Sequence, residues 1–184
     1  MEVKEFVLKA LERTPMLLAN ALKDVRPDEL KWRPGPQANS IGFILWHVTR
    51  AEDRFIHTLI QQKPQVWEQP KWRQLLPNLP SDPAATGGGF TSDQVGEFQT
   101  PKQEDLMQYN QAVRAATVDF LKDLPQNELN RTIDLPRLGK ITCAEVIALL
   151  LGEINSHIGQ MDYIRGLAQS LRKEMSALKW SNGR

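Results

Sequence analysis

The sequence has few of the features that mark secreted, membrane or nucleic-acid-binding proteins. Cys143 is its one cysteine, so no internal disulfide is possible, as is usual in a reducing compartment. A membrane-spanning helix needs about 18 uninterrupted apolar residues, and no apolar stretch of this sequence approaches that length. The N-terminus also lacks the basic, apolar and small-residue segments of a secretory signal. We therefore expect a cytoplasmic protein of bacterial type, with no membrane partner.

The sequence also has no excess of positive or negative charge. The 23 basic and 22 acidic side chains give a formal net charge of +1. Nucleic acids and anionic membranes attract proteins through an excess of positive charge, which is missing here. We find no DNA-reading motif, dinucleotide fingerprint or nucleophile elbow. Nucleic acid is therefore not expected as a partner.

Four long segments have apolar residues at the three- and four-residue spacing that predicts helices with one buried face. Two of these segments have clear start signals, Thr100 before Pro101 and the capping box of Thr142 with Glu145. The chain is 184 residues long, which fits one domain. The sequence predicts an all-α, antiparallel four-helix bundle over residues 1–170 and a basic, frayed C-terminal tail over 171–184. The expected helices are 4–23 (broken or kinked at Pro15), 40–62, 101–124 and 142–169.

The connection 63–101, between the second and third expected helices, is unusually long. Connections of this length in a compact domain are usually functional or binding loops. It contains Trp67, Trp72 and Phe90, whose apolar surface would be costly to leave in water, so we expect it to fold back over one end of the bundle. Its glycines at 87–89 lack the Lys-Ser/Thr of a phosphate loop and indicate a flexible turn. In the next connection, 125–141, residues 132–135 are expected to form a short extended piece.

Two polar residues interrupt the apolar face of the last expected helix. Glu153 and His157 are on that face, which also carries Val146, Leu150, Met161 and Ile164. A lone carboxylate facing a core costs several kcal/mol or gives up its charge, so a partner is required. Residues at i and i+4 have Cβ atoms about 5–6 Å apart. A carboxylate oxygen and an imidazole nitrogen at that spacing can both bind a metal ion at about 2.0–2.2 Å.

A third ligand has to come from another helix. Only two other histidines exist, His47 and His57, and they are about 15 Å apart along a helix, too far to bind one ion together. His47 has apolar neighbours, whereas His57 is near the polar end of its helix, so His47 is the better candidate. A site of His47, Glu153 and His157 leaves an open coordination position, which is typical of catalytic metal sites.

Simpler interpretations of these residues stay open. Glu153 and His157 could form an exposed ion pair along one helix face, and a histidine on an apolar face is often a hydrogen-bonded core residue. Cys143 could offer a thiolate, but it is ten positions before Glu153 on the same helix, so we expect a structural role for it.

Three short stretches of the sequence resemble the DinB-like superfamily of four-helix bundles, which includes damage-inducible proteins and bacillithiol-transferase-like proteins. With the helix order and the long second connection, the resemblance covers residues 4–169. The stretches are Trp32-Arg33-Pro34 followed by Asn39-Ser40-Ile41, Leu45-Trp46-His47-Val48 with Glu52-Asp53-Arg54 one turn on, and His157-Ile158-Gly159-Gln160 ahead of Arg165-Gly166.

The resemblance implies a divalent metal ion, often zinc or nickel, bound by three histidines. His47 and His157 match two of them, but position 153 is a glutamate where the family most often has a histidine. A carboxylate can bind a metal, and its charge favours harder ions such as iron or manganese. We therefore expect a site of two histidines and one glutamate. Glu52 or Asp53 is our candidate for orienting one of these ligands.

The resemblance also implies an activity on a small-molecule substrate and an oligomeric state. The family includes thiol S-transferases, in which a low-molecular-weight thiol attacks an electrophilic substrate, and homodimers are common. A metal-dependent hydrolase is the alternative enzyme, and a non-enzymatic, stress-related binding bundle is the alternative outside the enzymes.

Overall fold

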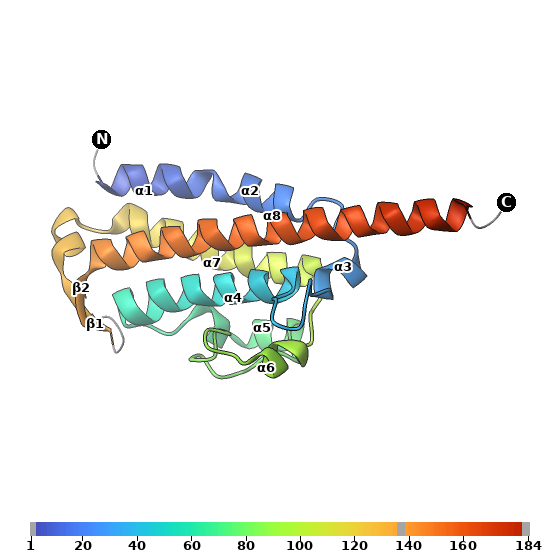
Figure 1. Ribbon diagram of the computed structural model, residues 1–184. Coiled ribbons are helices and arrows are strands. Elements are labelled where there is room, and N and C mark those ends of the chain that lie inside the picture. The colour runs from blue at the N-terminus through green and yellow to red at the C-terminus, as the bar shows by residue number, and fades with distance from the viewer. Residues whose placement is uncertain (1–2, 136–138, 182–184) are drawn as a thin grey trace.

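The computed structural model describes residues 3–135 and 139–181, with side chains up to Ser176. In this part of the chain, four long helical rods form the body of the molecule (Figure 1). The rods are α1 (Val3–Glu12) continued by α2 (Thr14–Ala21), α4 (Ile41–Asp53) continued by the π-helix η1 (Arg54–Gln61), α7 (Gln103–Asp123), and α8 (Cys143–Ser181). The predicted all-α class is confirmed.

Contacts at the helix ends give the direction of each rod. At the start of α1, Lys4 Nζ donates to the carbonyl of Lys122 at the end of α7 (3.0 Å), so α1 and α7 are antiparallel. Arg131, after α7, donates to the Ile60 carbonyl at the end of η1 (2.6 Å), so α4 and α7 run the same way. The amide of Cys143, which begins α8, donates to the Arg131 carbonyl (2.9 Å), so α8 is antiparallel to α4. The antiparallel prediction therefore applies to the α1–α7 and α4–α8 pairs.

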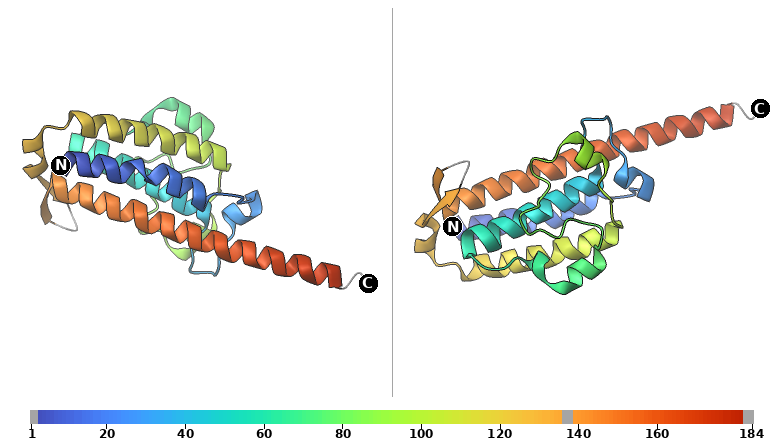
Figure 2. Two further views of the ribbon diagram at one scale, coloured as in Figure 1. Left: turned by 90° about the horizontal axis from the view of Figure 1, so that it is seen from above. Right: turned by 90° about the horizontal axis from the view of Figure 1, so that it is seen from below.

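The long connection explains why α4 and α7 are parallel. It returns the chain to the end of the bundle where α4 began (Figures 1 and 2). It contains three short helices, η2 (Val66–Glu68), α5 (Pro70–Leu75) and α6 (Ser92–Gly96). Our expectation that it covers one end of the bundle is wrong, because it lies along the flank of α4 and α7 (Figure 1).

Aromatic side chains attach this connection to the flank. The rings of Trp67 and Trp72 pack on Tyr109 of α7, with centroids 5.2 and 5.3 Å away. Phe90 packs on Phe43 and Trp46 of α4, each at 6.1 Å. The long side faces of two helices offer more apolar surface to large rings than a helix end does, and burial of that surface stabilises this arrangement.

Two of the predicted helix boundaries are confirmed. The first rod breaks at Arg13, directly before the Thr14-Pro15 pair, as the proline predicted. The capping box of α8 is also present. The Thr142 amide donates to Glu145 Oε2 (2.6 Å), and the Glu145 amide donates to Thr142 Oγ1 (3.2 Å). The Thr142 amide and the Thr142 hydroxyl (2.8 Å) both donate to the Glu145 carboxylate, and these two hydrogen bonds hold its pKa below the usual value.

Three other boundaries differ from prediction. Thr100 does not cap α7, whose N-cap residue is Lys102. The Thr100 methyl group instead packs against α4 at Gly42, in the space that a side chain there would fill. The second helix does not stay regular to residue 62 but widens into η1, a form that often occurs near functional sites. The last helix does not end near Gln169 but reaches Ser181, because residues 170–181 contain no Gly or Pro and Arg172 pairs with Glu29 of α3 (Pro27–Lys31; 3.4 Å).

The segment between α7 and α8 contains a 3₁₀ turn and a small hairpin. The turn is η3 (Gln126–Asn130), and the hairpin pairs β1 (Thr132–Leu135) with β2 (Gly139–Thr142) in antiparallel register, Ile133 opposite Ile141. The extended piece predicted at 132–135 is therefore confirmed, whereas β2 was not predicted.

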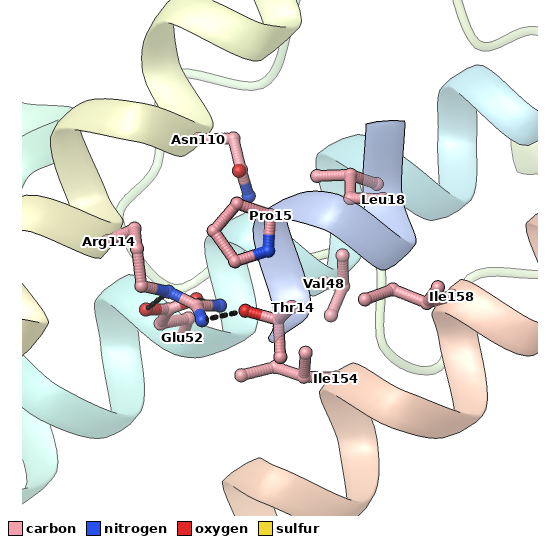
Figure 3. A pocket seen from close by; sticks show the side chains of 9 residues that line it. All are labelled: Thr14, Pro15, Leu18, Val48, Glu52, Asn110, Arg114, Ile154 and Ile158. Carbon is pink, nitrogen blue, oxygen red and sulfur yellow. Dashed lines mark hydrogen bonds and ion pairs between the residues drawn. The ribbon is translucent and has the colours of Figure 1, made fainter. Parts of the chain in front are cut away.

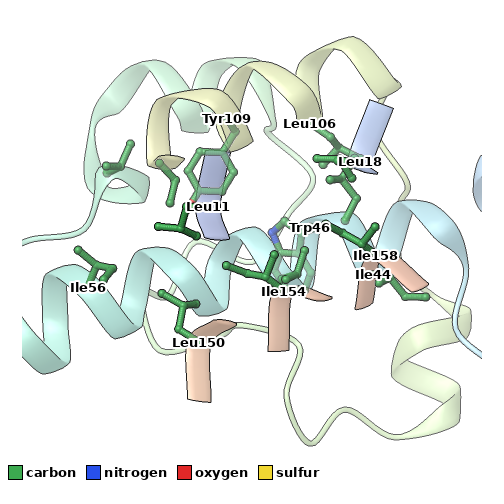
Figure 4. Packing of buried hydrophobic residues seen from close by; sticks show 14 of the residues in the cluster. Leu11, Leu18, Ile44, Trp46, Ile56, Leu106, Tyr109, Leu150, Ile154 and Ile158 are labelled. Atoms are coloured by element: carbon green, nitrogen blue, oxygen red, sulfur yellow. The ribbon is translucent and has the colours of Figure 1, made fainter. Parts of the chain in front are cut away.

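The core lies between the four rods (Figure 4). It is apolar and receives side chains from every rod, including Leu11, Leu18, Ile44, Trp46, Leu106, Tyr109, Leu150 and Ile154. In the part of the chain that the structure describes, no helix is long and apolar enough to cross a membrane. The boundary predicted near residue 170 between domain and tail lies within α8 and stays a prediction.

Candidate metal centre

His47 lies on α4, and its ring is held by contacts on two sides. Its side chain is only 14% exposed. Nδ1 lies 2.7 Å from the carbonyl oxygen of Thr86 in the long connection. The ring is nearly parallel to that of Phe43, with an angle of 7° and centroids 6.2 Å apart. A carbonyl oxygen can only accept, so this contact is a hydrogen bond in the tautomer that carries its proton on His47 Nδ1.

Glu153 and His157 are one turn apart on α8, facing His47. Glu153 Oε1 lies 3.1 Å from His47 Nε2 and 3.1 Å from His157 Nε2. The two imidazole rings are perpendicular, with centroids 4.8 Å apart. On the far side of its ring, His157 Nδ1 donates to Gln160 Oε1 (2.9 Å). The structure thus brings together the three residues predicted as metal ligands.

The hydrogen-bond partners of the two rings leave three acceptor atoms facing one another. In the tautomer whose N–H is at Nδ1, facing the Thr86 carbonyl in His47 and Gln160 Oε1 in His157, each Nε2 presents a lone pair. Both lone pairs point at the same carboxylate oxygen of Glu153. A metal ion placed between these three acceptor atoms would satisfy all of them.

The two distances from the histidines to Glu153 fit a metal ion. The ligand atoms of His47, Glu153 and His157 all lie within 4.8 Å of one another. Neighbouring ligands of a tetrahedral ion with bonds of about 2.0–2.1 Å are about 3.3 Å apart, close to the two 3.1 Å separations here. Hydrogen bonds that fix Nδ1 and turn Nε2 toward the ion are also usual for metal-binding histidines. The donor set therefore suits a divalent ion with open coordination positions.

A shallow, mostly apolar groove lies along α8 and shares Glu153 with this site. Its other lining residues are Ile141, Glu145, Ala148, Leu149 and Gly152. The Glu153 side chain is 37% exposed, the most accessible of the three predicted ligands. A small molecule could therefore reach the carboxylate from this side.

The expectation that Glu52 or Asp53 orients a ligand is wrong, because both carboxylates are used elsewhere. Glu52 accepts two hydrogen bonds from Arg114 of α7 (2.8 and 2.7 Å), and Arg114 also donates to Thr14 (Figure 3). This group lines a small pocket between α2, α4, α7 and α8. It joins three helices through buried polar contacts and lies apart from the histidines of the candidate site.

Asp53 is the centre of a second buried polar cluster. Its side chain is fully buried and accepts from the amides of Val66 and Trp67 (2.9 Å each), the Tyr109 hydroxyl (2.6 Å) and Arg50 (3.3 Å). Burial alone would raise the pKa of Asp53, but its hydrogen bonds from His57, Tyr109, Trp67 and Val66 outweigh burial and hold that pKa below its usual range. The pKa of Tyr109 is well above its usual value because its hydroxyl is buried and faces Asp53.

The other candidate ligands considered from the sequence have structural positions. His57 Nδ1 lies 2.8 Å from Asp53 Oδ1, and the Asp53 carboxylate raises the pKa of His57 although burial opposes this. Cys143 is completely buried, and burial raises the pKa of its thiol. Neither residue belongs to the cluster of His47, Glu153 and His157.

Two residues of the site were not predicted. Gln160 had a visible signal, because it follows His157 by three positions and so lies on the same helix face. Thr86 had none, because it acts through its backbone carbonyl, which every residue type has, from 39 positions away.

The fold and the site together define an all-α bundle with a candidate metal centre of two histidines and one glutamate. Residues 10–161 match the DinB superfamily, so the chain belongs to that superfamily, as the resemblance indicated. Members of this superfamily often bind a metal ion.

Among solved structures, a conserved protein from Enterococcus faecalis is 20% identical, with a TM-score of 0.79. The alignment covers 90% of this chain and 96% of that one. This likeness supports the fold. No curated protein matches the chain.

Proposed function

We propose that this protein is an enzyme that depends on a divalent metal ion bound by His47, Glu153 and His157. The leading reaction is thiol S-transfer, in which a low-molecular-weight thiol attacks an electrophilic substrate. The observation that carries the proposal is the convergence of two oriented imidazole lone pairs on one partly exposed carboxylate. A bound metal would supply a Lewis acid that lowers the pKa of a coordinated thiol or water.

The protein's own residues account for binding and orientation. Thr86 and Gln160 hold the two imidazoles with Nε2 toward Glu153. The turn at Thr86 covers the His47 side of the site and limits the access of water there. The apolar groove that includes Glu153 suits the apolar part of a substrate, with the reacting group at the metal.

Metal content is the first test, and the chain offers a matched control among its three histidines. We expect about one zinc or nickel ion per chain in the reconstituted wild type, measured by elemental analysis after dialysis. His47→Gln and His157→Gln should lose the ion, whereas His57→Gln should keep it, because His57 pairs with Asp53 away from the site. Equal metal content in all three variants would contradict the proposal.

Glu153→His tests the residue at which this chain departs from the family pattern. A third imidazole should tighten zinc or nickel binding and weaken the preference for iron or manganese, with folding unchanged. Competition titrations with a chromophoric chelator measure both affinities. If neither affinity changes, Glu153 is not a ligand.

The donor set also favours a second reaction, metal-assisted hydrolysis, because two histidines and one glutamate hold zinc in some hydrolytic enzymes. A panel of small thiols with electrophilic acceptors, assayed beside ester and amide substrates, separates the two reactions. Turnover that requires a thiol supports transfer, and turnover without one supports hydrolysis. Metal binding without turnover on any of these substrates would favour a non-enzymatic binding bundle. The homodimer implied by the family stays a prediction, to be checked by light scattering.

A further inference from the structure

The turn that contacts His47 belongs to the run of three glycines in the long connection. The Thr86 carbonyl accepts from His47 Nδ1 at 2.7 Å, and Gly87, Gly88 and Gly89 follow directly. A side chain at Gly88 would place its Cβ 3.8 Å from His47 Cε1, in ordinary contact with the ring edge. The turn is therefore packed against the candidate ligand.

Gly87 is the residue that allows this close approach. Its φ is +86°, a conformation that side chains disfavour. It also lies on two rings of α4, so an added Cβ would be 2.8 Å from Trp46 Cζ3 and 3.0 Å from Phe43 Cζ. Both conditions exclude any residue larger than glycine without movement of the turn or of the rings.

The rings that support Gly87 also support His47. Phe43 is nearly parallel to the His47 imidazole. Phe90, just beyond the glycines, packs on Phe43 and Trp46, which fixes the far side of the turn. The turn and the imidazole therefore share one aromatic support, and their relative position is determined by it.

We propose that the turn Thr86–Gly87–Gly88 sets the tautomer of His47, with Gly87 as the positioning residue. The Thr86 carbonyl can only accept, so it keeps the proton on Nδ1 and leaves the Nε2 lone pair directed at Glu153. A reversed ring would place a carbon atom against the carbonyl and lose this hydrogen bond. The consequence for metal binding rests on the proposed function, but the tautomer itself does not.

The first experiment reads the tautomer in the metal-free wild-type protein. Long-range ¹H–¹⁵N NMR of the imidazoles, recorded above the ordinary pKa of histidine, distinguishes Nδ1–H from Nε2–H. His47→Gln identifies the His47 signals by their disappearance. We expect His47 to be the Nδ1–H tautomer. An Nε2–H tautomer, or a mixture like that of free histidine, would overturn the proposal, whether or not the protein binds metal.

The second experiment compares Gly87→Ala with Gly89→Ala. Both glycines have positive φ, +86° and +83°, so both substitutions strain the backbone. Only the Cβ at 87 meets the rings, because nothing lies within 4 Å of one at 89. We expect Gly87→Ala to weaken zinc binding about 10- to 100-fold, the usual effect of losing the partner of a metal-binding histidine, and to abolish the Nδ1–H signature. Gly89→Ala should leave both within a few-fold of wild type.

The possible results separate this proposal from the metal-centre proposal. If both alanine variants have the same zinc affinity and the same tautomer, Gly87 has no positioning role and the inference fails. If the wild type binds no metal, the metal-centre proposal fails while the NMR result still decides the tautomer. If Gly87→Ala does not fold, the wild-type tautomer alone supports or overturns the role of the turn.

Discussion

Asp53→Asn should strongly destabilise the protein, although the substitution barely changes the shape of the side chain. Asp53 Oδ1 accepts from the Val66 amide and lies 2.8 Å from His57 Nδ1. Oδ2 accepts from the Trp67 amide, the Tyr109 hydroxyl and Arg50. An asparagine has one acceptor oxygen, so its amide nitrogen would face at least two donors.

The magnitude follows from the burial of the charges. Asp53 and Arg50 are both 0% exposed, so loss of the carboxylate leaves a buried guanidinium without its counter-charge. Breaking such a pair costs about 3–5 kcal/mol. For a chain of this size each kcal/mol lowers Tm by roughly 2–4 °C, which gives a decrease of about 6–20 °C.

Urea unfolding of wild type and variant, followed by far-UV circular dichroism, measures this cost. Asp119→Asn is the matched control, because Asp119 carries the same group in an ion pair with Lys122 but its side chain is 74% exposed. Exposed pairs contribute at most about 1 kcal/mol. A loss below about 1 kcal/mol for Asp53→Asn would refute the view that this cluster attaches the long connection to the bundle.

Three further predictions concern stability. The His57 pKa is raised above 6.5, so its pairing with Asp53 stabilises the fold fully below pH 6.5, and this contribution is lost as pH rises through the folded-state pKa. The free-energy difference between wild type and His57→Gln, from urea unfolding across pH, should therefore shrink as pH rises, and a constant difference would contradict this. Gly159→Ala should stabilise by up to about 1 kcal/mol, because it lies inside α8 with open space around an added Cβ. Gly42→Ala should instead destabilise, because its Cβ would overlap Thr100; equal Tm changes in thermal melts of the two variants would rule out this steric explanation.

Local patterns in the sequence determined the long helices and two of the three candidate ligands, Glu153 and His157. The break at Pro15, the capping box of Thr142 with Glu145 and the pairing of Glu153 with His157 all depend on residues within four positions of one another. Contacts of that range are formed by the helix itself, whatever the rest of the chain does. Spacing along one helix also showed that His47 and His57 could not share an ion.

Tertiary structure decided the features that join distant segments. His47 meets Glu153 across 106 positions and Thr86 across 39, and neither contact has a local pattern that could predict it. The parallel direction of α4 and α7 depends on where the long connection packs its tryptophans. Tertiary structure also decided the partners of Asp53, because the Val66 and Trp67 amides reach its carboxylate only after the long connection folds against the bundle. The sequence by itself determined which side chains share a helix face, whereas the packing of the rods determined which faces meet, because packing sums many weak contacts between segments far apart in the chain.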